Sequence, residues 1–297
     1  MIKERMVPRF LWCFSIILFL LVNYAWIENK TSHALKTPQI MLHSVLDAQP
    51  ELIADQNHTL YLPIIQSPPL EPPYDMALFM IGDGRLYEVW HSNDSQARHQ
   101  TQIENDLFYH TKGDEYSAEW EELWATDDTI YRGVDTSSGD GTFYILRDES
   151  NQVGSAWSPR FWDVGDLYER QPLVTFYQKA DCAVLVNGYQ HSWLRFEAYY
   201  PTYTFDSGIT LANVIELAWL LEPDSTPIET YFYAINHGLV AWTNNDRGFS
   251  YISEIHAPGQ RPDNTREYIP CLQSVRQVSP ITLGSILEPL PPPYRAK

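Results

Sequence analysis

Short runs in which apolar and polar residues alternate, separated by turn residues, recur after residue 74 and constrain the fold most. Residues 129–135 and 142–148 are two such runs, and the six residues between them include two glycines. Alternation places every second side chain on one face of a strand, whereas an amphipathic helix needs a period near 3.6. The pattern therefore predicts an all-β fold, an antiparallel meander that forms a sandwich or a curved half-barrel.

Two turn sequences locate expected hairpins. Asn187 and Gly188 lie between the strand-like residues 183–186 and 193–199. Asn-Gly is a strong hairpin signal because both residues tolerate positive φ, so a turn is predicted there. A second turn is expected at residues 236–238, where Asn236 and Gly238 have the same tolerance.

Residues 231–242, with the pattern Tyr-x-Tyr-Ala followed by Gly-Leu-Val-x-Trp, resemble a hairpin found in uncharacterised exported bacterial β-domain proteins. The chain departs from that pattern at the turn, where Asn236 and His237 replace a usual second glycine. The resemblance implies an antiparallel sheet, in a form such as the curved half-barrel of lipoprotein-carrier domains. It brings no activity, ligand or catalytic residue with it.

The N-terminus has the features of an export segment. Lys3, Arg5 and Arg9 precede an apolar run over residues 10–26, and polar residues follow. Such a positive flank stays in the cytoplasm, so the rest of the chain is expected outside the cell membrane. The run suits either an uncleaved signal anchor or a signal peptide cut after Ala34, and both alternatives remain open.

Proline-rich stretches mark the expected domain borders. Residues 1–37 are the signal peptide or anchor, and residues 38–73 are an extracytoplasmic spacer that ends in prolines. One β domain is expected over 74–278, followed by a proline-rich tail over 279–297.

Charge excludes one class of partner. The chain has 20 Lys and Arg against 38 Asp and Glu, a net charge of −18. Such a protein repels phosphate backbones, so nucleic acid is not expected as a partner. Contact with the membrane is expected through the N-terminal segment only. No cofactor or metal site is predicted, because no recognised binding motif occurs.

Cysteine usage predicts one disulfide. After the apolar run only Cys182 and Cys271 remain. Two cysteines in an oxidising compartment are expected to pair, and the alternative is two buried free thiols.

Candidate binding residues are mostly aromatic, because flat rings can cover the apolar face of a sugar. The alternative for each ring is a place in the core. The candidates are Trp120, Trp124, Trp157, Tyr203 and His256.

The sequence thus favours a non-catalytic, envelope-associated binding or structural module, with a neutral glycan or another envelope component as partner. The alternative is a secreted glycoside hydrolase that uses Glu119 and Glu122, which interleave with Trp120. No catalytic residue is assigned in the favoured interpretation.

Overall fold

A computed structural model describes residues 70–91, 95–139, 141–244, 248–277 and 288–289. The chain divides into two compact units, residues 1–64 and 65–297, and every described residue belongs to the second. The expected export segment therefore lies outside the described residues, as do nearly all of the spacer and of the tail. Within the part that is described, no helix is both long and apolar enough to cross a membrane.

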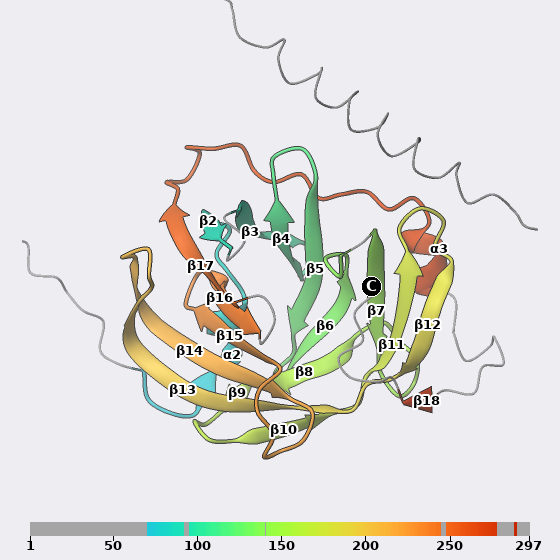
Figure 1. Ribbon diagram of the computed structural model, residues 1–297, viewed down its shortest axis with the longest axis horizontal. Helices are drawn as coiled ribbons and strands as arrows, with labels where there is room; N and C mark the ends of the chain where they lie inside the picture. The colour runs from blue at the N-terminus through green and yellow to red at the C-terminus, as the bar shows by residue number, and fades with distance from the viewer. Residues whose placement is uncertain (1–69, 92–94, 140, 245–247, 278–287, 290–297) are drawn as a thin grey trace, which may run out of the picture. The chain divides into compact units, whose positions relative to one another are not determined.

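The described residues form an all-β structure dominated by one large sheet (Figure 1), which confirms the predicted class. Sixteen strands in this part of the chain join that sheet, and all neighbours pair in antiparallel fashion except β12 and β18. The strands of the large sheet are β2 Leu86–Trp90, β3 Gln96–Glu104, β4 Leu107–Gly113, β5 Ala118–Ala125, β6 Thr129–Asp135, β7 Thr142–Arg147, β8 Ser155–Pro159, β10 Leu167–Arg170, β11 Leu173–Gln178, β12 Val184–Tyr189, β13 Ser192–Thr204, β14 Thr210–Leu220, β15 Glu229–Ala234, β16 Gly238–Asn244, β17 Gly248–Ile255 and β18 Glu288–Pro289.

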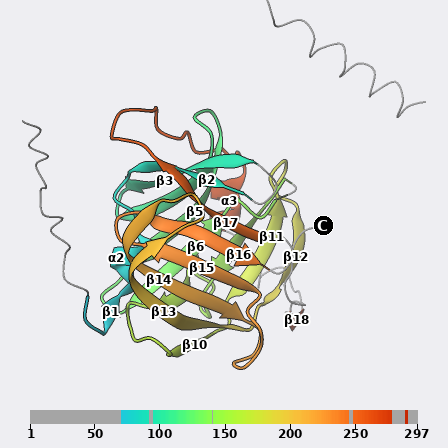
Figure 2. The same ribbon diagram turned by 60° about the vertical axis from the view of Figure 1, so that its left-hand side comes forward.

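The meander is present as two runs, β2 to β7 and β13 to β17, and β17 pairs with β2 to join them. Figure 2 shows the strands from β13 to β17 side by side. Strand β6 divides the sheet, because its first half pairs with β8 and its last two residues pair with β7. Strand β8 lies beside β10, where Arg170 Nε donates to the carbonyl oxygen of Ala156 over 3.4 Å.

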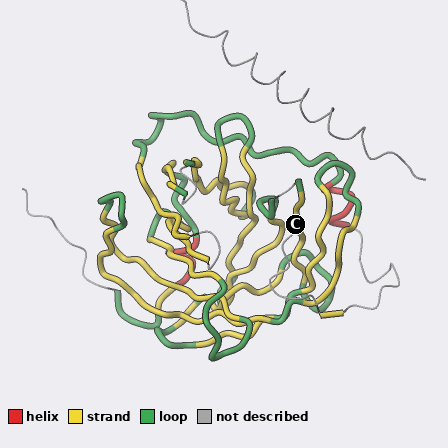
Figure 3. The backbone as a smooth tube through the Cα atoms, viewed as in Figure 1, coloured by secondary structure: helices red, strands yellow, loops and turns green. Residues whose placement is uncertain are grey.

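A short helix packs against the inner face of the curled sheet. Helix α2, Met76–Met80, follows the two-residue strand β1, Tyr74–Asp75, which pairs with β9, Phe161–Trp162. Its N-cap is Asp75, whose carboxylate accepts from the Ala77 N–H. Figure 3 shows this helix enclosed by the strands. Its buried residues Met76 and Phe79 share a core with Leu194, Phe196, Ile215 and Leu217.

A second core covers the outer face of β4 to β7 and β11. Trp120, Phe143 and Tyr177 pack there against the chain around α3, Leu272–Gln277. The Cys182–Cys271 disulfide holds this layer, with 5.9 Å between the two Cα atoms. The predicted pairing of the two cysteines is therefore confirmed.

One predicted turn is present and the other is wrong. Asn236 and Gly238 have φ angles of 67° and 80° and connect β15 to β16. Asn187 and Gly188 instead lie inside β12, where Gly188 pairs with Val174 of β11. The Asn187 side chain accepts from the Thr175 hydroxyl over 2.9 Å, so the ladder with β11 overrides the local turn preference.

Candidate functional site

A row of polar side chains crosses four neighbouring strands on the inner face of the sheet. The register pairs His110 of β4 with Glu121 of β5, Glu121 with Asp135 of β6, and Asp135 with Tyr144 of β7. Directly paired residues of antiparallel strands project from the same face. Four separate segments thus bring ionisable groups together where a simple alternating strand would place apolar ones.

Arg132 holds the carboxylates of this row. Its Nε contacts Glu121 Oε1, and its Nη2 lies 3.4 Å from Asp135 Oδ2. Asp135 also accepts from the Tyr144 hydroxyl over 2.6 Å and from the Ser137 N–H and hydroxyl. Both oxygens of Asp135 therefore have donors within the protein.

Burial and neighbouring charges shift the two carboxylates in opposite directions. Burial raises the pKa of Glu121, although the charge of Arg132 opposes the shift. Burial also acts to raise the pKa of Asp135, but Lys112, Arg132 and the hydrogen bonds from Ser137 and Tyr144 outweigh it and lower that pKa. Opposed pKa shifts of this kind are typical of acid and base pairs in enzymes.

Two arginines meet on one tryptophan beside this row. The guanidinium carbons of Arg132 and Arg170 lie 4.0 Å and 3.9 Å from the ring centroid of Trp157. Guanidinium groups are attracted to the negative face of an aromatic ring, so Trp157 positions both cations. Its ring is 3% exposed and is already covered by the arginines.

Aromatic side chains of β15 also lie beside the polar row. Tyr231 and Tyr233 of β15 lie on the same face, and the ring of Tyr231 is 6.0 Å from that of Trp157. The side chains of Glu121 and Arg132 are 16% and 12% exposed, whereas Arg170 is 6% exposed. We call these residues the interior cluster: Glu121, Arg132, Asp135, Tyr144, Trp157, Arg170, Tyr231 and Tyr233.

The five aromatic and histidine candidates from the sequence do not form one surface. Trp120, Trp157 and Tyr203 belong to three different hydrophobic clusters, and only Trp157 is part of the interior cluster. Trp124 stacks on Tyr131, with ring centroids 5.4 Å apart. His256 is buried, with its Nε2 3.0 Å from Glu88 Oε1.

Glu119 and Glu122 are three residues apart on β5, and their carboxylates contact different cations. Glu119 forms an ion pair with Lys179 over 2.9 Å. Glu122 is fully buried and pairs with Arg276 of α3, also over 2.9 Å. Each carboxylate thus has a cationic partner, although Lys179 also pairs with Glu267 over 2.8 Å.

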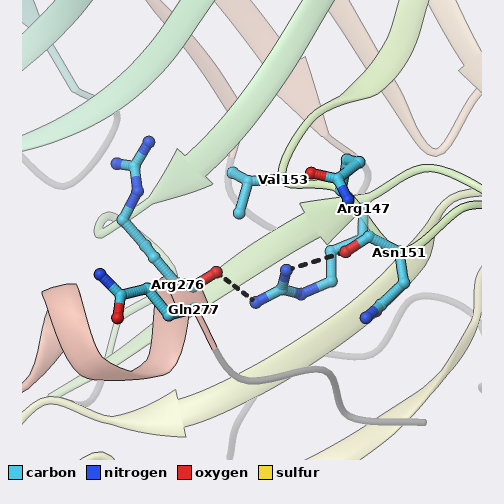
Figure 4. Close-up of a pocket in the computed structure, with 6 residues that line it drawn as sticks. Arg147, Asn151, Val153, Arg276 and Gln277 are labelled. Atoms are coloured by element: carbon cyan, nitrogen blue, oxygen red, sulfur yellow. Dashed lines mark hydrogen bonds between the residues drawn. The ribbon is translucent and has the colours of Figure 1, made fainter.

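A surface pocket of about 520 Å³ lies where α3 meets the end of β7 (Figure 4). Arg147 crosses it and donates to the carbonyl oxygens of Asn151 and Arg276 over 3.1 Å and 3.4 Å. The Arg276 side chain points away from Arg147 in this view. These contacts fasten α3 to the sheet, and they leave the interior cluster as the stronger candidate site.

Most residues of the interior cluster were not predicted from the sequence, because they come from six strands with no local motif. One signal was available. Basic residues are scarce after residue 37, yet Arg132 stands between Ile130 and Val134 in an alternating run. Within the described ranges, no group of three or more His, Cys, Asp or Glu side chains is placed to hold a metal ion.

Comparison of the chain with models of known families, with curated proteins and with solved structures finds no match.

Proposed function

We propose that the chain is a non-catalytic binding module of the cell envelope that holds a glycan inside its curled sheet. The observation that carries the proposal is the interior cluster, which combines aromatic rings with hydroxyl, carboxylate and guanidinium groups, and in which Glu121 and Arg132 are partly exposed. Sugars are bound by such combinations, because rings cover their apolar faces while polar groups bond to their hydroxyls.

The contacts of the carboxylates favour binding over hydrolysis. A retaining glycosidase needs a free carboxylate as nucleophile near a second one that acts as acid. Glu121 and Asp135 are adjacent, and their pKa values are shifted apart, which is the observation that supports the hydrolase alternative. Against it, Asp135 accepts hydrogen bonds from Ser137 and Tyr144 and faces Arg132, so its lone pairs are engaged.

The proposed location is the outer side of the cell membrane, and it rests on the charge pattern of residues 1–37. The N-terminal segment either anchors the domain or is removed by cleavage. Protease added to intact cells should remove or release the domain. Full protection, under conditions that digest a known surface protein, would contradict this location.

A glycan array probed with the full chain tests the binding function. We expect a defined set of glycans to bind and none to be hydrolysed. Trp242 lies on the inner face, opposite Tyr231 and against the rings of His91 and His99. Trp242→Ala should weaken binding by about 2 kcal/mol, the size of a buried aromatic contact.

Trp193→Ala is the matched control. The ring of Trp193 lies 4.2 Å from that of His191, and Trp193 lies on the opposite face of β13 from Ser192 and Leu194. The control variant should bind as the wild type does. No binding to any glycan by the folded wild type, or equal losses in the two variants, would contradict the proposal. Hydrolysis that Glu121→Gln abolishes would instead support the hydrolase.

A further inference from the structure

Arg170 is a buried cation that lacks an anionic partner. It is 6% exposed, and among the described residues no carboxylate oxygen lies within 4.0 Å of its guanidinium nitrogens. Its one protein hydrogen bond within those residues is the 3.4 Å contact from Nε to the Ala156 carbonyl. Arg132, by contrast, has both Glu121 and Asp135. A buried charge without a counterion is costly, so this arrangement suits a site that is completed by a ligand.

Three hydrogen-bond donors near Arg170 are buried and have no hydrogen-bond partner among the described residues. They are Trp157 Nε1, Ser192 Oγ and Trp219 Nε1. Ser192 is paired with Arg170 in the register, and the ring of Trp157 contacts its guanidinium group. Trp219 is paired with Leu194, two residues along β13 from Ser192, and therefore lies on the same face. Three strands, β8, β13 and β14, thus contribute unsatisfied donors to the region around Arg170.

These groups match one ligand chemistry. The guanidinium fork bonds both oxygens of a carboxylate, and hydroxyl and indole groups can donate to the same oxygens. The two arginines and the two carboxylates of the interior cluster are equal in number, but both carboxylates lie against Arg132, so the carboxylate of a ligand can pair directly with Arg170. The surrounding rings of Tyr231 and Tyr233 and the polar row beyond them suit a hydroxylated ring better than an alkyl chain. A carboxylate on a sugar satisfies all of these features.

We infer that the interior of the curled sheet binds an acidic glycan, with the carboxylate of a uronic acid held by Arg170, Ser192 and Trp219. The inference rests on the proposed function and specifies its ligand. The scarcity of basic residues in the whole chain favours a neutral glycan, but two of the few arginines are gathered at this site. Glu229, the carboxylate paired with Trp219, already accepts from the Tyr231 hydroxyl over 2.5 Å.

The electrostatic surroundings agree with this geometry. Burial, followed by the positive charge of Arg132, lowers the pKa of Arg170 to about 9. A bound carboxylate favours the charged guanidinium and therefore opposes both effects. Salt should weaken the interaction only moderately, because the pair of Arg170 and the ligand carboxylate is buried and dissolved ions reach it poorly.

Calorimetric titration of the full chain with a galacturonic acid trimer and with the corresponding neutral galactose trimer tests the inference. We expect the wild type to bind the acidic trimer on the order of tenfold to a hundredfold more tightly, as a charge-assisted hydrogen-bond pair implies. Arg170→Gln should remove this preference, so that the variant binds the acidic trimer no more tightly than the neutral one.

Arg195→Gln is the matched control. Arg195 lies on the next strand, faces the opposite side of the sheet and bonds to Glu197. It should keep the preference for the acidic trimer. Should Arg170→Gln fail to fold, Ser192→Ala is expected to reduce the preference while the thermal unfolding curve stays cooperative.

The outcomes separate the two proposals. Equal affinity of the wild type for both trimers would overturn the acidic ligand and leave glycan binding intact. Binding of neither trimer, together with a blank glycan array, would overturn both. Tighter binding of a fatty acid such as laurate than of the acidic trimer would also contradict the inference.

Discussion

Arg276 of α3 reaches across the outer layer of the domain to Glu122 of β5, and 2.9 Å separates Nη2 from Oε1. The carboxylate is completely buried, whereas the arginine side chain is 25% exposed. Glu122 also accepts from the Val134 N–H over 3.3 Å. Glu122 thus connects helix α3 to the bulge of β5, and its role is structural.

Glu122→Gln should therefore destabilise the domain. Removing one partner of a buried ion pair costs about 3–5 kcal/mol, and the partial exposure of Arg276 places the expected loss near the lower end. Glu119→Gln, at a carboxylate that is 38% exposed, should cost less than about 1 kcal/mol. Urea unfolding followed by tryptophan fluorescence measures both values. Equal losses would contradict the assigned roles.

Gly154 tests how closely the outer layer is packed. Its φ is 109°, and a Cβ there would lie 2.1 Å from the Trp124 ring. Gly165 has a similar φ of 96° but open space around it. Both Gly→Ala changes strain the backbone, so the extra loss at Gly154, about 1–3 kcal/mol, reports the clash alone. Thermal unfolding of the two variants makes the comparison, and no difference between them would count against this packing.

The buried histidine pair predicts a loss of stability in mild acid. His99 Nδ1 lies 3.0 Å from His110 Nε2, and burial lowers the pKa of both, that of His110 to about 3. The unfolded chain takes up protons below about pH 6.5, whereas the folded chain does so only near the lowered values. Stability from this pair is therefore complete above pH 6.5 and falls as the pH decreases from there.

Each proton bound only by the unfolded chain lowers the free energy of unfolding by about 1.4 kcal/mol per pH unit. His110→Gln should therefore give a shallower decline between pH 6.5 and 4.5, measured by urea unfolding at several pH values. His191→Gln, at a solvent-exposed ring, is the control. An unchanged slope in His110→Gln would show that the pair is not buried in its neutral form.

The disulfide should contribute strongly to stability. Its cysteines are 89 residues apart, and closing a loop of that length is worth about 4–5 kcal/mol in the chain-entropy model, an upper value if the unfolded chain keeps structure. Reduction, or replacement of both cysteines by serine, should lower the free energy of unfolding by up to that amount. Mass spectrometry of a non-reduced digest identifies the linkage, and two alkylatable thiols in protein isolated without reductant would rule it out.

Local patterns predicted local structure well. Alternation identified β6 and β7, and the positive-φ tolerance of Asn236 identified the turn before β16. The pattern failed at Asn187, because pairing with β11 is a long-range interaction that no neighbouring residue reveals. The resemblance of residues 231–242 to exported β-domain proteins remains a prediction.

The interior cluster was beyond the reach of the same patterns. Arg170 and Trp157 are brought together only because β8 and β10 lie side by side, and that proximity of two strands not paired with each other depends on how the whole sheet curls. Trp120, which looked like a binding residue, packs instead under the chain around α3, because that segment supplies apolar partners.

The most direct test is a crystal structure of the protein with a galacturonic acid oligosaccharide. We predict that the sugar lies inside the curled sheet, with its carboxylate within hydrogen-bond distance of the Arg170 guanidinium group. A sugar bound only on the outer face, or Arg170 paired with a carboxylate of its own chain, would contradict the proposed site.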